Sequence, residues 1–202
     1  MAEPLHRRFE PLVAALVAAL EPELDGPFAF FGHSLGTLLA FETARELRRR
    51  KRPLPLHLFA AARIAPHVAF EHIPVDRLSD DALIAVLQER YQSIPAEIMR
   101  ERDLLELVLK PLRADLEVHA SYVHAHEEPL PIPLTALGGA DDRLVTREGL
   151  EAWREHTTSP FTMHLLPGGH YFHQAHEEAV LRIVAPELSA SRTDTNRHGS
   201  AR

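Results

Sequence analysis

A serine between two glycines is the residue of this chain best suited to act as a nucleophile. Residues 32–36 read Gly-His-Ser-Leu-Gly, and the Gly-x-Ser-x-Gly spacing places Ser34 on a sharp turn from a strand into a helix. The apolar run Phe28 to Phe31 before it is typical of a buried strand, and leucines at helical spacing follow from Leu35. The pentapeptide alone often arises by chance, but this context predicts a nucleophile elbow in which both glycines let strand and helix approach closely.

Two later sites supply the other groups that a serine nucleophile requires. A hydroxyl needs a base to accept its proton, and that base needs a carboxylate to orient it. Asp141 and Asp142 follow one later apolar stretch and His170 follows the next, which is the chain order expected with a nucleophile elbow. Taken singly, Ser34 could be a helix N-cap, the aspartates turn residues and His170 a surface residue. Their joint order favours a catalytic triad.

The elements that must position these residues alternate between short apolar strands and helices. Strands are predicted at 28–31, 56–60, 132–137 and 161–166, and helices at 9–24, 35–50, 79–91, 95–126 with a break near Pro111, 148–156 and 177–188. This alternation predicts an α/β fold with a mostly parallel sheet. Because the carboxyl ends of parallel strands meet at one edge of a sheet, Ser34, one of the two aspartates and His170 are expected to lie together.

A long insertion separates the second predicted strand from the third. Roughly seventy mostly helical residues lie there, far beyond the usual length of a connection. We expect a lid at about 67–127, although an extra helical layer without a gating role fits the same pattern. Residues 1–188 are expected to form a single domain, and the polar residues 189–202 a disordered tail.

The composition excludes several classes of site and partner. The chain of 202 residues has no cysteine, so it can form neither disulfides nor thiolate metal sites, which fits a cytoplasmic location. A net charge of −7 argues against nucleic acid as a partner. No apolar stretch approaches the length of a membrane span, and residues 1–10 lack a signal-peptide pattern.

Two groups of polar residues invite other interpretations. Among the 14 histidines, His170, His173 and His176 recur every three residues, yet no carboxylate at ligand spacing accompanies them, so no metal is expected. The basic run at 45–52 could hold an acidic partner, but complementing the dipole at a helix C-terminus explains it better. His33, beside the nucleophile, is expected to be structural or to line the pocket rather than to act in catalysis.

Four motifs together resemble the type II thioesterases of nonribosomal peptide and polyketide synthesis. They are Gly32-His-Ser-Leu-Gly36, Arg63-Ile-Ala-Pro-His67, Gly138-Gly-Ala-Asp-Asp142 and Leu166-Pro-Gly-Gly-His-Tyr-Phe172. The resemblance runs from about Glu3 to Leu188, and residues 78–122 resemble the lid of that family. It implies an α/β-hydrolase that cleaves acyl thioesters from the phosphopantetheine arm of carrier proteins and so restores blocked synthases in antibiotic biosynthesis.

The resemblance also implies roles for individual residues. Ser34 would be the nucleophile, His170 the general base and then acid, and Asp142, rather than Asp141, the orienting carboxylate. The backbone N–H of Leu35 would donate one hydrogen bond to the oxyanion. The reaction would pass through an acyl-serine without a metal or organic cofactor, and the partners would be acyl or peptidyl carrier domains. We expect the protein itself to be a monomer.

The front of the chain departs from the family pattern. Members carry further strands and a glycine-rich oxyanion loop ahead of the region matched here, so the chain is expected to be N-terminally truncated and to lack a second oxyanion donor. The strand at 28–31 would then be a sheet edge. Two alternatives to an active thioesterase follow: a weakly active or inactive module that binds carrier proteins, and a general carboxylesterase.

Overall fold

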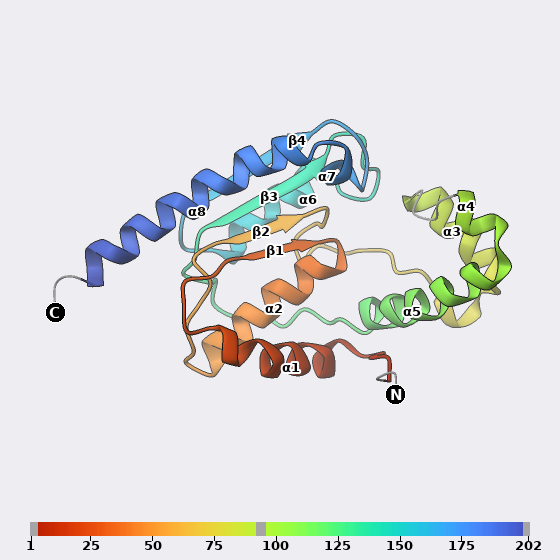
Figure 1. Cartoon of the computed structure of the whole chain (residues 1–202), viewed down its shortest axis with the longest axis horizontal. Helices are drawn as coiled ribbons and strands as arrows, with labels where there is room; N and C mark the ends of the chain where they lie inside the picture. Colours follow the sequence, from red (N-terminus) through yellow and green to blue (C-terminus); the bar gives the residue numbers. More distant parts are fainter. Residues whose placement is uncertain (1–3, 92–95, 200–202) are drawn as a thin grey trace. The chain divides into compact units, whose positions relative to one another are not determined.

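Short parallel strands and longer helices alternate along the chain (Figure 1). The structure is a computed structural model that describes residues 4–91 and 96–199. Its strands are β1 (Phe30–His33), β2 (Leu58–Ala61), β3 (Leu134–Gly139) and β4 (Phe161–Leu166). They form one sheet in the order β1-β2-β3-β4, and each neighbouring pair is parallel. The predicted α/β fold with a mostly parallel sheet is confirmed.

The helices follow the predicted order. They are α1 (Phe9–Leu20), α2 (Leu35–Arg49), α3 (Asp80–Tyr91), α4 (Ala96–Arg100), α5 (Arg102–Ala120), α6 (Arg147–Glu151), α7 (Phe172–Ala175) and α8 (Glu177–Gly199). Short 3-10 turns lie at Glu21–Glu23, Val75–Arg77 and Ala152–His156. In the parts of the chain that the structure describes, no helix is both long enough and apolar enough to cross a membrane.

Two helices differ from the sequence expectation. The predicted break near Pro111 does not occur, because α5 runs through this residue. Leu107, whose carbonyl loses its partner to the proline, is 71% exposed, so water can replace the missing hydrogen bond. The tail expected to be disordered from 189 is instead helical as far as Gly199, and no proline or glycine within 189–198 interrupts α8 there. The predicted helix start at Pro95 and residues 200–202 lie outside the described residues.

The chain divides into two compact units. Val13–Val68 with Ala125–Arg202 form one of them, called the sheet unit because it contains all four strands. Met1–Leu12 with Ala69–His124 form the other, called the insertion unit because it contains most of the insertion predicted at 67–127. One cluster of buried apolar residues in this unit consists of Ile73, Val75, Leu83, Leu87 and Leu109. The insertion therefore has a hydrophobic core of its own, and its gating role stays a prediction.

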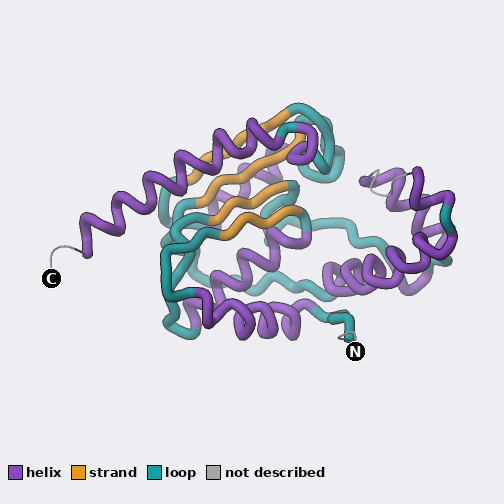
Figure 2. The backbone as a smooth tube through the Cα atoms, in the orientation of Figure 1, coloured by secondary structure: helices purple, strands orange, loops and turns teal. Residues whose placement is uncertain are grey.

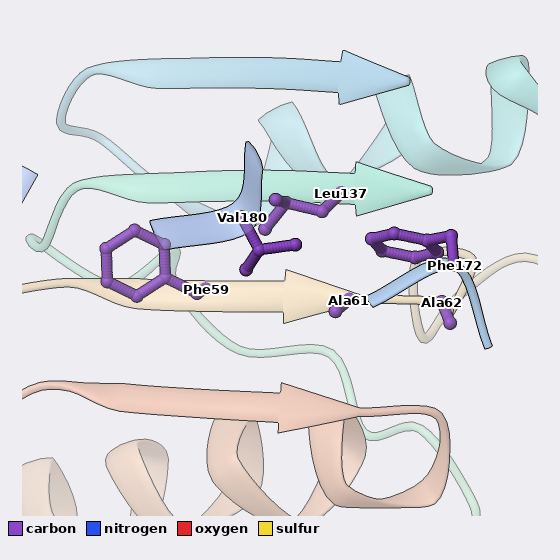
Figure 3. Close-up of a cluster of buried hydrophobic side chains, with 6 residues drawn as sticks. All are labelled: Phe59, Ala61, Ala62, Leu137, Phe172 and Val180. Atoms are coloured by element: carbon purple, nitrogen blue, oxygen red, sulfur yellow. The ribbon is translucent and has the colours of Figure 1, made fainter. Parts of the chain in front are cut away.

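The two central strands of the sheet unit, β2 and β3, lie in its core. Every residue of β2 and β3 is buried. On one face, Phe59 and Leu137 pack against Phe172 of α7 and Val180 of α8 (Figure 3), and α8 runs along the strands (Figure 2). Burying one large apolar side chain stabilises a fold by about 2 kcal/mol. This packing fixes the segment that follows His170 against the sheet.

The strand that leads to Ser34 lies at an edge of the sheet. Among the described strands, β1 pairs only with β2, through the register Phe30 to Leu58 and His33 to Ala61. Phe31 is 45% exposed on this strand. The prediction that this strand is a sheet edge is confirmed for the described strands.

Candidate active site

Ser34 occupies the strained turn that its sequence context predicted. It lies between the end of β1 and the start of α2 with φ 54° and ψ −118°. Such a positive φ costs a non-glycine residue on the order of 1–3 kcal/mol, so the surroundings must hold it. The Ser34 N–H donates to the Ala61 carbonyl at 2.9 Å, and the Ser34 carbonyl accepts from the Thr37 N–H at 3.1 Å. Neighbouring backbone thus presents the serine hydroxyl on a fixed turn.

The two glycines of the turn have different surroundings. A Cβ at Gly32 would lie 2.4 Å from the Gly36 carbonyl oxygen and 2.4 Å from the Thr37 Cα, so no side chain fits there. A Cβ at Gly36 would meet nothing within 4 Å. Close approach of strand and helix therefore requires glycine at position 32 alone, and the expectation that both glycines serve this purpose is wrong for Gly36. The residue faces open space instead.

The predicted triad residues form one hydrogen-bonded chain. His170 Nε2 lies 3.0 Å from Ser34 Oγ, and His170 Nδ1 lies 2.8 Å from Asp142 Oδ2. The side chains of His170 and Asp142 are only 6% and 1% exposed. Because the buried carboxylate accepts a hydrogen bond from Nδ1–H, the Nε2 lone pair faces the serine hydroxyl, which is the tautomer that a general base requires.

The two neighbouring aspartates do different things. Asp142 Oδ1 accepts the Leu144 N–H at 2.9 Å, which orients its carboxylate toward His170. Asp141 Oδ2 instead accepts the Gly168 N–H at 3.2 Å, and the Asp141 N–H donates to the Gly168 carbonyl at 2.9 Å. The structure therefore places Asp142 in the chain of hydrogen bonds, whereas Asp141 holds the loop that carries His170.

That loop packs closely on the end of β3. A Cβ at Gly139 would lie 2.2 Å from the Gly169 carbonyl oxygen and 2.4 Å from that of Gly168. Gly168 itself has φ 99°, a conformation that glycine adopts without strain. Gly139 at the end of β3 thus lets the acid loop and the histidine loop touch. Sequence inspection placed the glycine pairs 138–139 and 168–169 at strand ends without revealing this contact.

The predicted oxyanion donor lies at a helix N-terminus. Leu35 is the first residue of α2, so its N–H has no acceptor within the helix and remains available to a ligand. The partial positive charge of a helix N-terminus adds to the attraction for a developing oxyanion. Its role as an oxyanion donor stays a prediction.

His33 makes a contact that the sequence did not reveal. Its Nε2 lies 2.8 Å from the backbone carbonyl oxygen of His170. Its ring also lies against Tyr171 and His173, with centroid distances of 5.5 and 4.3 Å. Burial lowers the pKa of His33 to about 4, so the ring is neutral at physiological pH.

The basic run at 45–52 forms ion pairs, and the histidines do not form a metal site with the described side chains. Arg45 and Arg48 contact the Glu127 carboxylate at 2.8 and 2.9 Å, and Arg49 contacts Glu46 at 2.7 Å. The first two pairs link the end of α2 to the segment around Glu127 within the sheet unit, and the third lies within α2. Among the side chains that the structure describes, no group of three or more His, Asp or Glu is arranged to hold a metal.

Comparison with known proteins gives a family match and similar relatives over most of the chain. Residues 1–188 match the thioesterase domain family. A curated relative, linear gramicidin dehydrogenase LgrE of Brevibacillus parabrevis, is 37% identical over 191 residues, which are 93% of this chain and 72% of that protein.

Two solved structures are also similar to the chain. RedJ, a thioesterase from the prodiginine biosynthetic pathway of Streptomyces coelicolor, superposes with a TM-score of 0.83 at 37% identity, covering 90% of this chain and 72% of RedJ. BorB, a type II thioesterase from the borrelidin biosynthetic cluster, gives a TM-score of 0.80 at 33% identity, covering 93% of this chain and 73% of BorB.

Proposed function

This chain belongs to the thioesterase domain family, and from that premise we propose that it is a type II thioesterase that uses Ser34, His170 and Asp142 to hydrolyse acyl thioesters on carrier proteins. Its similarity to RedJ and BorB, which are thioesterases from two biosynthetic pathways, supports the biosynthetic setting. LgrE is named a dehydrogenase, but nothing in this sequence indicates that activity. The sequence lacks the Gly-x-Gly-x-x-Gly turn that is typical of dinucleotide-binding sites.

One observation carries the mechanism: the unbroken chain from Ser34 Oγ through the His170 imidazole to the buried Asp142 carboxylate. In the first half-reaction His170 accepts the Ser34 proton as Oγ forms a bond to the thioester carbonyl carbon. The carbonyl oxygen becomes an oxyanion, which the Leu35 N–H stabilises. Collapse of the intermediate breaks the carbon–sulfur bond, and His170 gives its proton to the departing pantetheine thiolate.

The second half-reaction uses the same groups with water as the nucleophile. His170 takes a proton from water as its oxygen attacks the acyl-serine carbonyl carbon. When the carbon–Oγ bond breaks, His170 returns the proton to Ser34 and the free acid leaves. The Asp142 carboxylate stabilises the imidazolium that forms twice per cycle. No step needs a metal or an organic cofactor besides the phosphopantetheine of the substrate.

The triad geometry favours an active hydrolase over a module that only binds carrier proteins. A strained serine turn and a buried carboxylate–imidazole pair each cost folding free energy, and such strain is typical of functional sites. A carboxylesterase would need the same triad, so the leaving group distinguishes the two activities. A thiolate leaves far more readily than an alkoxide, and the family relationship favours the thioester.

Hydrolysis of matched substrates tests the proposal. The wild-type protein is expected to cleave an acyl-pantetheine thioester faster than the corresponding oxygen ester, and Ser34→Ala is expected to lower kcat by about 10³-fold or more. Ser189→Ala, which removes an exposed serine of α8, serves as the control with unchanged activity. Equal cleavage of thioester by Ser34→Ala and wild type would refute the proposal, and a preference for oxygen esters would establish a carboxylesterase.

A further inference from the structure

The imidazole of His33 lies against the segment that carries the proposed base. His33 is the last residue of β1 and directly precedes Ser34. Its ring centroid is 5.1 Å from that of His170, and it stacks on Tyr171 with an interplanar angle of 28°. These contacts join two segments that are separated by 137 residues along the chain.

The polar contact between the segments has a defined direction. A backbone carbonyl can only accept, so the 2.8 Å contact requires that His33 Nε2 carry the proton and donate it to the His170 oxygen. In the neutral ring the Nδ1 atom then holds a lone pair. The bond is partly buried, and water competes less for such a bond than for an exposed one.

The adjacent residues His33 and Ser34 therefore both contact His170, at two different points. Ser34 Oγ contacts the tip of the His170 side chain at 3.0 Å, while His33 Nε2 contacts the backbone oxygen of His170 at 2.8 Å. Asp142 holds the remaining ring nitrogen at 2.8 Å. With its backbone and both ring nitrogens bonded, the His170 imidazole has little freedom to leave the line between nucleophile and carboxylate.

We propose that His33 is a positioning residue of the thioesterase, whose Nε2–H anchors the His170 backbone and so keeps the imidazole aligned with Ser34. The proposal rests on the function assigned above. An anchor of this kind acts on the transition states of both half-reactions, because His170 moves a proton in each. Substrate binding does not involve this hydrogen bond, so we expect kcat rather than KM to depend on His33.

The electrostatic setting suits an anchor that must stay uncharged. Burial lowers the pKa of His33 to about 4, and His170 and His173 act in the same direction, while Asp142 and the hydrogen bond to the His170 carbonyl oppose them. Burial and His170 also lower the pKa of His173. Both neighbours are thus neutral when His170 becomes an imidazolium, and neither adds a second positive charge beside it.

Substitutions at His33 can separate the hydrogen bond from simple packing. His33→Gln keeps an N–H donor on a side chain of similar reach, and His33→Met has nearly the same length without a donor. His33→Phe keeps an aromatic ring against Tyr171 and His173 but cannot donate. The same three changes at His126, an exposed histidine of the sheet unit, are matched controls that leave activity unchanged.

The test measures kcat and KM of all variants together with an NMR signal of the triad. We expect His33→Met and His33→Phe to lower kcat by roughly 10- to 100-fold with KM within about twofold of wild type, and His33→Gln to recover most of the loss. The low-field Nδ1–H resonance of His170 is expected to broaden or vanish in the Met variant and to persist in the Gln variant.

Three results would overturn the proposal. These are a kcat of His33→Met within about twofold of wild type, a Gln variant as impaired as the Met variant, and losses that merely follow the folded fraction seen by circular dichroism. If His33→Phe does not fold, the Gln and Met pair decides alone. Failure of the proposed function would appear separately, as full thioester hydrolysis by Ser34→Ala, whereas the imidazole resonance reports on the anchor without any turnover.

Discussion

The two units of this chain use close packing for different purposes. In the sheet unit, backbone approaches backbone so tightly at Gly32 and Gly139 that an added Cβ would lie within 2.4 Å of a neighbouring atom. In the insertion unit, side chains such as Leu83 and Leu87 fill a helical core. Close packing in the sheet unit therefore fixes the geometry of its polar groups. In the insertion unit it stabilises the helices of that unit. Substitutions in the sheet unit should therefore mainly lower kcat, and core substitutions in the insertion unit should mainly lower its stability.

The sharpest contrast within the sheet unit is between its two adjacent aspartates. Asp142→Asn removes the charge that orients and stabilises His170, so kcat is expected to fall by about 10³- to 10⁴-fold. Asp141→Asn, which affects only the side-chain bond from the Gly168 N–H, is expected to cost about tenfold or less. Steady-state hydrolysis of an acyl-pantetheine thioester measures both. Equal losses in the two variants would contradict the assignment of Asp142.

Backbone approach in the sheet unit is tested at Gly139. Gly139→Ala places a methyl group against the Gly168 and Gly169 carbonyls, which must move together with the loop that carries His170. A displacement of about 1 Å at a catalytic group costs on the order of 100-fold in kcat. Gly26→Ala, whose Cβ would meet nothing within 4 Å, is the matched control. Wild-type kcat in a folded Gly139→Ala protein would argue against the close contact of the two loops.

The insertion unit should lose stability without losing the triad. Leu87 is 1% exposed in its core, so Leu87→Ala is expected to destabilise this unit by about 2–5 kcal/mol. Hydrogen exchange should therefore accelerate in α3 and α5, while β2 and β3 stay protected. Leu107→Ala, at a position 71% exposed in the same unit, is the control with little change. Accelerated exchange throughout the sheet would show that the two units unfold together.

A smaller effect is expected from acid. Burial lowers the pKa values of His33, His57 and His173, so the unfolded chain binds more protons than the folded protein below about pH 6.5. The free energy of unfolding of the sheet unit should fall as the pH is lowered from about 6.5 to 4, because protonation then favours the unfolded state. Urea unfolding at several pH values measures the slope, and His33→Met should reduce it. A slope unchanged by that substitution would contradict the buried, neutral state of His33.

Much of the site could be predicted because its residues lie where strands end. The apolar run before Ser34, the aspartates after the third strand and His170 after the fourth follow from periodicity and chain order alone. Parallel strands bring their carboxyl ends to one edge, so the approximate meeting of these residues needs no tertiary detail. The family resemblance then favoured Asp142 over its neighbour, and the structure places Asp142 against His170.

The contacts that escaped prediction depend on tertiary approach. The bond from His33 to the His170 carbonyl joins residues far apart in sequence, and neither residue type signals it. The same holds for the different surroundings of Gly32 and Gly36, which the pentapeptide pattern treats alike. Pro111 was expected to interrupt a helix, but solvent exposure at Leu107 lets water take the place of the lost donor.

Covalent labelling of Ser34 tests the central claim most directly. A fluorophosphonate probe reacts with a serine hydroxyl that an adjacent base activates, so the wild-type protein should gain a single label, located on Ser34 by peptide mass spectrometry. His170→Ala should react at least about 100-fold more slowly, because the hydroxyl then lacks its proton acceptor. No label on the folded wild-type protein, a label on another serine, or equal labelling of His170→Ala would contradict the account.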